Sequence, residues 1–514
     1  MADLPPRASS FWLETAEATA EPTTAAPPGT VPVEVDVAVL GAGIAGLTTA
    51  YLLAERGRTV AVVEPRQVAA GTTGHTTAKV TAQHGLNYHR LVERFDRATA
   101  RDYGQSQLAA FDWLVETVAA TGIDCDWEIR DSYVYAERDD QLGELRTEAR
   151  TAAELGLPAE FVTDPGLPYP VKGAVRFAGM AQFHPGKWLS GLARAVTALG
   201  GAVCTGVRAV GLDEGSPCRV RTTGGEIRAA DVVVATHYPI FDRGGYFARL
   251  TPTRDLVVAG PVPTAGAPPD MYLAVDGTRS VRTAPLEQDA ERRMLIVSGG
   301  HYRTGTTSEV LVRHRELADW GARTLRLSDI THRWSAHDLS TVDRLPYIGR
   351  YRPGSHRMWV ATGFGAWGMT NGTLAGLILA DLITGQPNPW AAVYDPNRVN
   401  SAMALGLVRD AAVAGSLLVG GHLGSLGGPS AEDLTPGQGT VIWRDGRPTA
   451  VSRDDDGTLH AVSARCTHLG CIVRWNDAER SWDCPCHGSR YDQRGDVLHG
   501  PATEPLRQTK PIDG

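Results

Sequence analysis

Cysteine is scarce in this chain, and its N-terminus lacks the features of an export signal. Only 7 of the 514 residues are cysteine. Cys125, Cys204 and Cys218 are scattered and odd in number, which excludes a disulfide framework among them and favours a reducing compartment. The first residues contain neither a basic region followed by an apolar stretch nor a twin arginine. The sequence therefore predicts a cytoplasmic protein.

Long apolar runs and an excess of basic charge are also absent. The apolar patch at 411–421 is about eleven residues long, about half of what a membrane-spanning helix needs, and Arg409 and Asp410 precede it. We expect a helix or linker there. The net charge is −8 and the isoelectric point is near 6.0. These values argue against nucleic acid or a membrane as a partner.

A complete dinucleotide-binding unit begins at residue 35. Residues 35–40 predict a buried strand, Gly41, Gly43 and Gly46 form a Gly-x-Gly-x-x-Gly turn, and residues 47–56 have helical apolar spacing. A second strand at 59–63 ends at Glu64. The glycines let the backbone approach a pyrophosphate at the helix N-terminus, and the acid suits a ribose hydroxyl. The unit alone does not distinguish FAD from NAD.

Further segments in chain order resemble the D-amino-acid oxidase family of FAD-dependent oxidoreductases over residues 35–396. They are the Thr-rich loop 71–79, the helix start 181–185, and the segments 203–207, 231–237, 341–349 and 360–372. The resemblance implies FAD, a Rossmann-like, doubly wound α/β domain, and an inserted antiparallel substrate sheet roughly within 80–340. It implies these FAD contacts: Gly41, Gly43, Ile44, Ala45, Gly46, Glu64, Thr76, Thr77, Val207, Thr236, Gly363, Gly365, Gly368, Met369 and Thr370.

The inserted region is predicted to be mostly strands after a stretch at 90–121 that is helical in pattern. The predicted strands are 129–136, 174–177, 256–262, 271–274 and 294–298. Catalytic candidates there and in the Thr-rich loop are Arg282, His301 and His75, although a structural role is equally compatible with each. His75 is also a candidate for covalent flavin attachment. Asp343 is either a turn-forming residue or a polar contact of the cofactor.

Two boxes near the C-terminus mix cysteine with histidine. Cys466-x-His468 is followed, after fifteen intervening residues, by Cys484-x-x-His487. Together the two boxes supply two thiolates and two imidazoles. A Rieske [2Fe–2S] centre requires that ligand set. Zinc uses the same ligand types, but its ligands usually come in pairs of one kind, Cys-x-x-Cys or His-x₃₋₅-His. Ligation of the irons of a [2Fe–2S] cluster by these side chains is therefore the leading interpretation.

Residues 434–506 resemble a Rieske domain of the respiratory kind. The resemblance implies that Cys466 and Cys484 bind the inner iron, and that His468 and His487 bind the outer, exposed iron. It implies a disulfide between Cys471 and Cys486. It also implies hydrogen bonds from Ser489 and Tyr491 to cluster sulfur and a ligand thiolate, which raise the reduction potential.

The sequence thus predicts a lead-in at 1–34, an oxidoreductase domain at 35–396, a helix or linker at 397–433 and a small all-β Rieske domain at 434–510. A flavin accepts two electrons as a hydride, whereas a Rieske centre handles one. We therefore expect oxidation of a small amine or amino acid, with electrons passing singly to an acceptor. Two alternatives are a reductase that takes electrons from a donor protein or NAD(P)H, and a non-enzymatic redox sensor. A second complete Gly-x-Gly-x-x-Gly unit for NAD(P)H is absent from the sequence.

Overall fold

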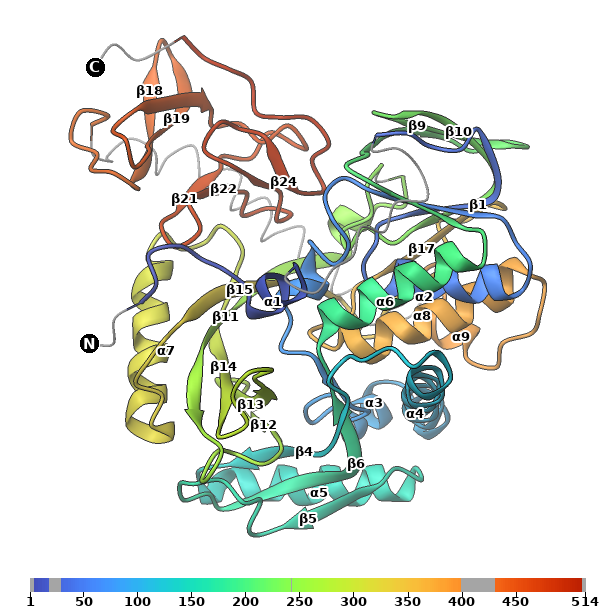
Figure 1. Cartoon of the computed structure of the whole chain (residues 1–514), viewed down its shortest axis with the longest axis vertical. Coiled ribbons are helices and arrows are strands. Elements are labelled where there is room, and N and C mark those ends of the chain that lie inside the picture. Colours follow the sequence, from blue (N-terminus) through green and yellow to red (C-terminus); the bar gives the residue numbers. More distant parts are fainter. Residues whose placement is uncertain (1–3, 18–28, 242, 399–429, 511–514) are drawn as a thin grey trace.

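The computed structural model describes residues 4–17, 29–241, 243–398 and 430–510. Two large sheets form the main body, and a smaller all-β region at the C-terminus sits against one end of it (Figure 1). Part of the predicted lead-in, and the predicted linker with its apolar patch at 411–421, lie outside the described residues. Among the described residues, no helix has the length and apolarity that a membrane crossing needs.

The first sheet is the predicted doubly wound core. Its central strands pair in parallel and consist of valine-rich runs, because both faces of such a sheet are covered. Its main path runs β16-β17-β10-β1-β2-β7, with β9 paired to β10 and β8 paired to β9. The strands are β1 Glu34–Leu40, β2 Val60–Glu64, β7 Ala202–Thr205, β8 Ala209–Asp213, β9 Cys218–Thr222, β10 Gly225–Val234, β16 Tyr347–Arg350 and β17 Met358–Thr362.

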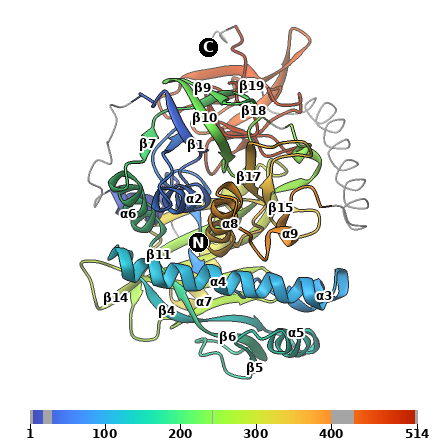
Figure 2. The ribbon, with the colours of Figure 1, turned by 90° about the vertical axis from the view of Figure 1, so that its right-hand side faces the viewer.

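Three helices pack together against one face of this sheet, as Figures 1 and 2 show. They are α2 Ile44–Glu55, α6 Pro185–Ala198 and α8 Gly368–Ile383. Alternate residues of β1 separate the two faces: Val37 and Val39 join the core beneath the helices, whereas Ala38 and Leu40 face a second core. The short helix α9 Ala391–Tyr394 follows α8.

The second sheet has nine strands and contains the predicted insertion. Its main path is β15-β11-β14-β13-β12-β4-β6-β3, and β5 pairs with β6. All pairings are antiparallel except that of β4 with β12, so the sheet is mixed at that one step. The strands are β3 Lys79–Val80, β4 Glu128–Ala136, β5 Ala159–Val162, β6 Gly173–Gln182, β11 Leu250–Pro263, β12 Met271–Ala274, β13 Arg279–Pro285, β14 Arg292–Arg303 and β15 His332–Thr341.

The helical pattern predicted at 90–121 is confirmed, and it forms two helices. The structure has α3 Tyr88–Arg94 and α4 Arg97–Thr121 with a break between them. The Asp96 carboxylate accepts a hydrogen bond of 2.7 Å from the backbone N–H of Thr99, so it caps a new helix rather than continuing the old one. Figure 2 shows α4 crossing the molecule below α2 and α8. Two further helices, α5 Leu142–Glu154 and α7 Val310–Leu325, cover the second sheet.

The N-terminal segment is anchored by α1 Phe11–Glu17. Trp12 is fully buried, and its indole N–H donates a 2.7 Å hydrogen bond to the carbonyl of Thr76. The guanidinium of Arg282 lies 5.1 Å from the centre of the same ring. The aromatic group at 11–13 therefore packs on the main body, beside the Thr-rich loop.

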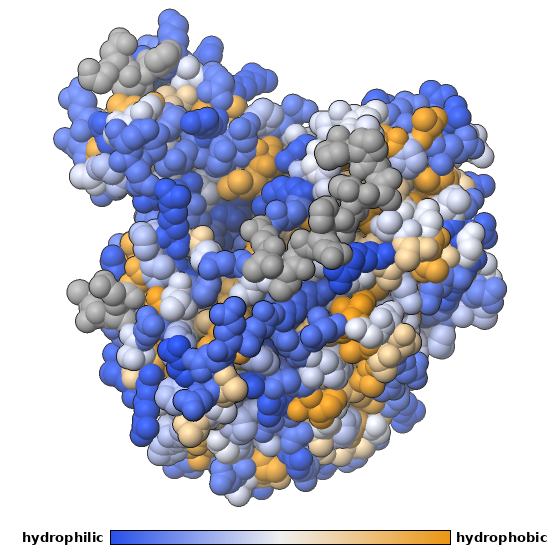
Figure 3. Space-filling model, in the orientation of Figure 1, coloured by the Kyte–Doolittle hydropathy of each residue, from blue (hydrophilic) through white to orange (hydrophobic). Residues whose placement is uncertain are grey.

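The C-terminal region consists of two small antiparallel sheets. They are formed by β18 Gly439–Arg444, β19 Arg447–Arg453 and β20 Leu459–Ser463, and by β21 Arg474–Asn476, β22 Ser481–Asp483, β23 Arg490–Tyr491 and β24 Val497–His499. This confirms the predicted fold class. The molecular face in Figure 3 is mostly hydrophilic, and its apolar residues are scattered in small groups.

Candidate active site and cluster loops

A cavity of about 1190 Å³ lies between the two large sheets. It is bordered by the turn after β1, the end of β2, the Thr-rich loop, and the segments that follow β10 and β17. The predicted FAD contacts line it, except for Gly46, Val207 and Thr370. The two residues after Val207 do line the cavity, and Thr370 bonds to His84, which lines it as well.

The dinucleotide end of the cavity is built largely from backbone. A Cβ at Gly41 would lie 2.5 Å from the carbonyl oxygen of Ala235, and one at Gly46 would lie 1.9 Å from that of Gly41. The Glu64 carboxylate accepts the backbone N–H groups of Ala42 at 3.1 Å and Arg66 at 3.0 Å. Burial raises the pKa of Glu64. This tight turn with an acid at its side fits a dinucleotide.

The Thr-rich loop forms one wall of the cavity. Its 3-10 turn, Thr72–His75, is fixed to β15 because the Thr72 hydroxyl donates a 3.0 Å hydrogen bond to the carbonyl of His337. Arg282 donates to the carbonyls of Thr77 at 3.0 Å and Ala78 at 2.7 Å. Arg282 does not line the cavity. Among the catalytic candidates it therefore has a supporting position behind the loop.

The other two candidates differ in position. His301 lines the cavity, and its Nδ1 lies 3.1 Å from a carboxylate oxygen of Asp255, which raises the pKa of the imidazole. His75 does not line the cavity, and its Nδ1 bonds to the carbonyl of Gly71 at 2.8 Å. Burial lowers the pKa of His75 to about 4. Covalent flavin attachment at His75 remains a prediction, and His301 is the candidate that faces the cavity.

Asp343 acts within a turn. Its buried carboxylate accepts hydrogen bonds of 2.8 and 2.7 Å from Arg398 and one of 3.2 Å from the backbone N–H of Leu345. It does not line the cavity. Of the two roles considered for it, the structure therefore shows the structural one.

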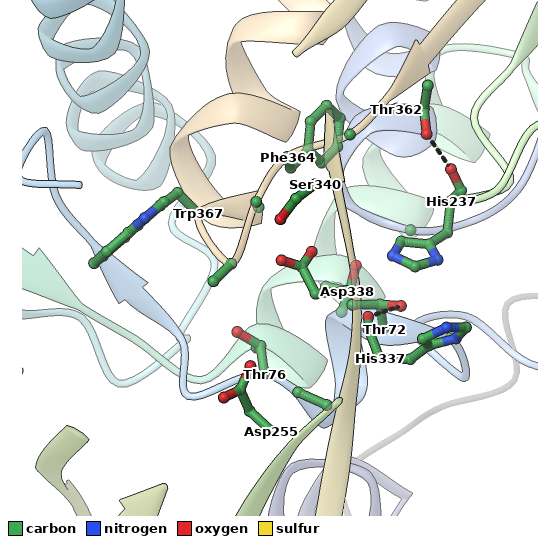
Figure 4. A pocket seen from close by; sticks show the side chains of 18 of the residues that line it. Thr72, Thr76, His237, Asp255, His337, Asp338, Ser340, Thr362, Phe364 and Trp367 are labelled. Atoms are coloured by element: carbon green, nitrogen blue, oxygen red, sulfur yellow. Dashed lines mark hydrogen bonds between the residues drawn. The ribbon is translucent and has the colours of Figure 1, made fainter. Parts of the chain in front are cut away.

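Sequence reasoning missed the acidic part of the cavity. Asp255 of β11 and Asp338 of β15 both line it and lie on the same side of the pocket as Thr76 (Figure 4). Asp338 is 8% exposed, and burial raises its pKa to about 7. Lys79 also lines the cavity. Its ammonium group donates a hydrogen bond of 2.5 Å to the Tyr272 carbonyl, and burial lowers the pKa of Lys79 to about 7.

The four predicted cluster ligands lie together in two loops. Cys466 and His468 lie between β20 and β21, and Cys484 and His487 lie between β22 and β23. The two imidazole ring centres are 5.0 Å apart, with their planes at 89°. Nδ1 of His487 is buried and has no hydrogen-bond partner among the described residues. Buried polar atoms normally have partners, so this nitrogen fits a metal ligand.

The residues around these loops also fit a cluster. Tyr491 places its hydroxyl 3.1 Å from the Cys466 sulfur, in reach of a thiolate ligand. The hydroxyl of Ser489 accepts a 3.1 Å hydrogen bond from the backbone N–H of Ala502, so its own proton remains available for another acceptor. Cys471 and Cys486 form a disulfide that joins the two loops.

The expected exposure of the histidine ligands is wrong for His487, which is 5% exposed. Its ring lies 5.9 Å from that of Phe247, and the ring of His468 lies 6.3 Å from that of Tyr238. Gly488 packs closely against His337, since a Cβ atom placed on Gly488 would lie 2.9 Å from Nε2 of the His337 ring. The side of the cluster loops that carries His487 thus faces the main body.

Several polar contacts hold this arrangement. Arg303 of β14 donates to the carbonyls of Pro485 at 3.2 Å and Cys486 at 3.1 Å. Arg333 of β15 donates to the carbonyl of Ala478 at 2.8 Å. Arg254 of β11 forms a buried ion pair with Glu479. Backbone acceptors of the second cluster loop are therefore bonded directly to the sheet that lines the cavity.

Comparisons with known proteins agree with this geometry. The family model for FAD dependent oxidoreductases matches residues 36–382, and the model for the Rieske [2Fe-2S] domain matches residues 429–510. YhfW of Bacillus subtilis (strain 168), named as a Rieske 2Fe-2S iron-sulfur protein, is 35% identical over 481 residues, covering 92% of this chain and 93% of that protein.

Partial similarities cover each region separately. Iron-sulfur subunit 2 of the cytochrome b6-f complex of Trichormus variabilis is 42% identical over 84 residues, which cover 15% of this chain and 47% of that protein. The fold of glycine oxidase from Geobacillus kaustophilus matches with a TM-score of 0.59 at 20% identity, over 72% of this chain and 100% of that chain. The chain belongs to the family of FAD-dependent oxidoreductases of the D-amino-acid oxidase type and carries a C-terminal Rieske [2Fe–2S] domain.

Proposed function

We propose that the protein oxidises the C–N bond of a small amine or amino acid and passes the electrons singly, through its Rieske cluster, to an external acceptor. When bound, FAD would supply a hydride acceptor, and the cluster would supply a carrier of one electron at a time. The residues proposed to hold the cluster are Cys466, His468, Cys484 and His487. The lining residues of the dinucleotide end are proposed to hold FAD.

The charges in the substrate part of the cavity support an amine. Asp255 and Asp338 contribute two carboxyl groups to the lining, and a substrate ammonium is complementary to them. A C–N bond is oxidised from the neutral amine, so a group must first accept a proton. Asp338 suits this task because its pKa of about 7 leaves it able to take a proton near neutral pH.

The electron-transfer part of the proposal rests on the packing of the second cluster loop against the main body. His487 is covered by the main body, and the neighbouring Gly488 contacts His337. His337 in turn lines the cavity and precedes Asp338 in β15. One side chain therefore separates the second cluster loop from the cavity. Such proximity favours transfer within a single chain.

The test is a His487→Ala variant, with His460→Ala as its matched control. His460 lies in the same C-terminal region and bonds to Asp454 at 2.7 Å, away from the cluster loops. Both variants are mixed anaerobically with a panel of amines and amino acids, and flavin bleaching is followed by stopped flow. Reduction of a one-electron acceptor, such as cytochrome c, is measured in parallel.

We expect His487→Ala to retain FAD and its reduction by substrate while acceptor turnover falls at least about 100-fold, because the cluster loses a ligand. His460→Ala should behave like the wild type. If the His487 variant reduces the acceptor as fast as the wild type, the cluster is not on the electron path. If no amine or amino acid bleaches the flavin of the wild type, the proposed substrate class is wrong.

A further inference from the structure

Three histidines from distant parts of the chain meet between the cavity and the cluster loops. His237 follows β10, His337 lies in β15, and His499 ends β24 of the C-terminal region. Each offers a ring nitrogen, and these nitrogens all lie within 4.8 Å of one another. We call this group the histidine triad. None of its members belongs to the Cys-His boxes.

The triad has the chemical state that metal ligation requires. Both ring nitrogens of His237 and of His337 are buried and have no hydrogen-bond partner among the described residues. Nδ1 of His499 lies 3.1 Å from the Gly500 carbonyl, which favours a proton on that nitrogen and leaves Nε2 as the ligand atom. Burial lowers the pKa of all three imidazoles, so they are neutral.

The ring spacing resembles that of the cluster histidines in the same chain. The three pairs of ring centres are 5.2, 5.0 and 4.5 Å apart, compared with 5.0 Å for His468 and His487. A zinc ion at about 2.0–2.1 Å from each nitrogen brings tetrahedral ligands to roughly 3.3 Å from one another. Among the described residues, His237 and His337 have no side-chain hydrogen bond that would have to break as the rings turn toward an ion.

Three arginines lie close enough to disfavour positive charge on the triad, and each has a carboxylate beside it. Arg254 and Arg490 both form ion pairs with Glu479, Arg490 also donates to Asp483 at 2.9 Å, and Arg66 lies beside Glu64. These carboxylates offset part of the positive charge. Imidazole nitrogens suit zinc, copper, nickel and iron, and three of them leave a coordination position for water.

We propose that the histidine triad is a second metal site, which binds one divalent transition-metal ion of the zinc class. Two ligands come from the oxidoreductase region and one from the C-terminal region. The bound ion would thus fasten β24 of the C-terminal region to the wall of the cavity. This proposal is independent of the substrate and of the direction of electron flow.

The experiment uses the full-length protein containing FAD and the cluster. It is treated with a chelator under conditions that leave its visible spectrum unchanged, then dialysed against Zn²⁺, and metals are counted by mass spectrometry. We expect one zinc per chain in addition to the iron of the cluster. His337→Phe and His499→Phe should lose that zinc at the concentration that saturates the wild type, and His460→Phe should keep it.

Two further variants separate ligation from misfolding. His337→Gln preserves a polar side chain of similar size and should also lose the zinc, whereas His499→Cys replaces one zinc ligand with another and should retain it. The proposal is overturned if the wild type binds no zinc beyond adventitious levels that His460→Phe and His337→Gln share. It is equally overturned if the triad variants keep the zinc but lose FAD, because the rings would then belong to the flavin site.

Discussion

The two ends of the large cavity are built differently. At the dinucleotide end, backbone atoms of the glycine turn approach one another and the carbonyl of Ala235 so closely that Cβ atoms at Gly41 and Gly46 have no room. At the substrate end, the lining consists of side chains from strands far apart in sequence, including Lys79, Asp255 and Asp338. The comparison teaches that cofactor binding is fixed by backbone geometry here, whereas substrate choice is left to replaceable side chains.

The largest effect is expected for Trp12, which supports the Thr-rich loop that forms one wall of the cavity. Trp12→Ala removes a fully buried ring and its hydrogen bond to Thr76, and such changes cost about 3–5 kcal/mol. The temperature at which flavin fluorescence appears should fall by on the order of 5–10 °C. Trp443→Ala is the control, because that ring is 40% exposed. Equal shifts for both variants would contradict a supporting role for Trp12.

The backbone-built end can be broken by a single methyl group. Gly46→Ala places a Cβ 1.9 Å from the Gly41 carbonyl oxygen, and overpacking against backbone costs about 3 kcal/mol. We expect at least a roughly 100-fold weaker affinity for FAD, measured by titration of the deflavinated protein. Gly143→Ala is the matched control, since no atom lies within 4 Å of its Cβ position. Unchanged FAD affinity in Gly46→Ala would show that the turn can relax.

At the substrate end, which is lined by side chains, Asp338 should make the rate of flavin reduction depend on pH. The carboxyl of Asp338 has a pKa raised to about 7, so its proton-accepting form increases as the pH rises through 7. Flavin reduction by an amine should therefore accelerate from about pH 6 to 8. Asp338→Asn should lower kcat/KM about 100-fold and abolish that limb, while FAD affinity stays unchanged. A limb near pH 7 that survives in Asp338→Asn would assign the titration to another group, such as Lys79.

The difference between the two ends also explains what the sequence could predict. The glycine turn with Glu64 and the two Cys-His boxes are local patterns, so the backbone geometry that they need is encoded within a few residues. Asp255 and Asp338 carry no such pattern. They meet only because β11 pairs with β15, with Asp255 opposite Ala336, and this register is a property of the folded sheet.

Asp96 and Arg282 show the same limit. The boundary at Asp96 depends on one carboxylate that caps a helix within an otherwise helical pattern. Arg282 appeared to be a catalytic candidate because it is charged, but the carbonyls that it binds come from the loop before β3 and from Phe183. Such partners are unknown until the tertiary fold is known. By contrast, the predicted strand at 271–274 coincides with β12, which has a clear apolar pattern.

The burial of His487 limits how an electron-acceptor protein can reach the iron–sulfur centre. An acceptor protein that docks on the side of the cluster loops that carries His487 needs the same surface that Phe247 and His337 already occupy. On the proposed electron path, loading of the cluster from within the chain and unloading to such a partner would therefore compete for one surface and could not take place at the same time.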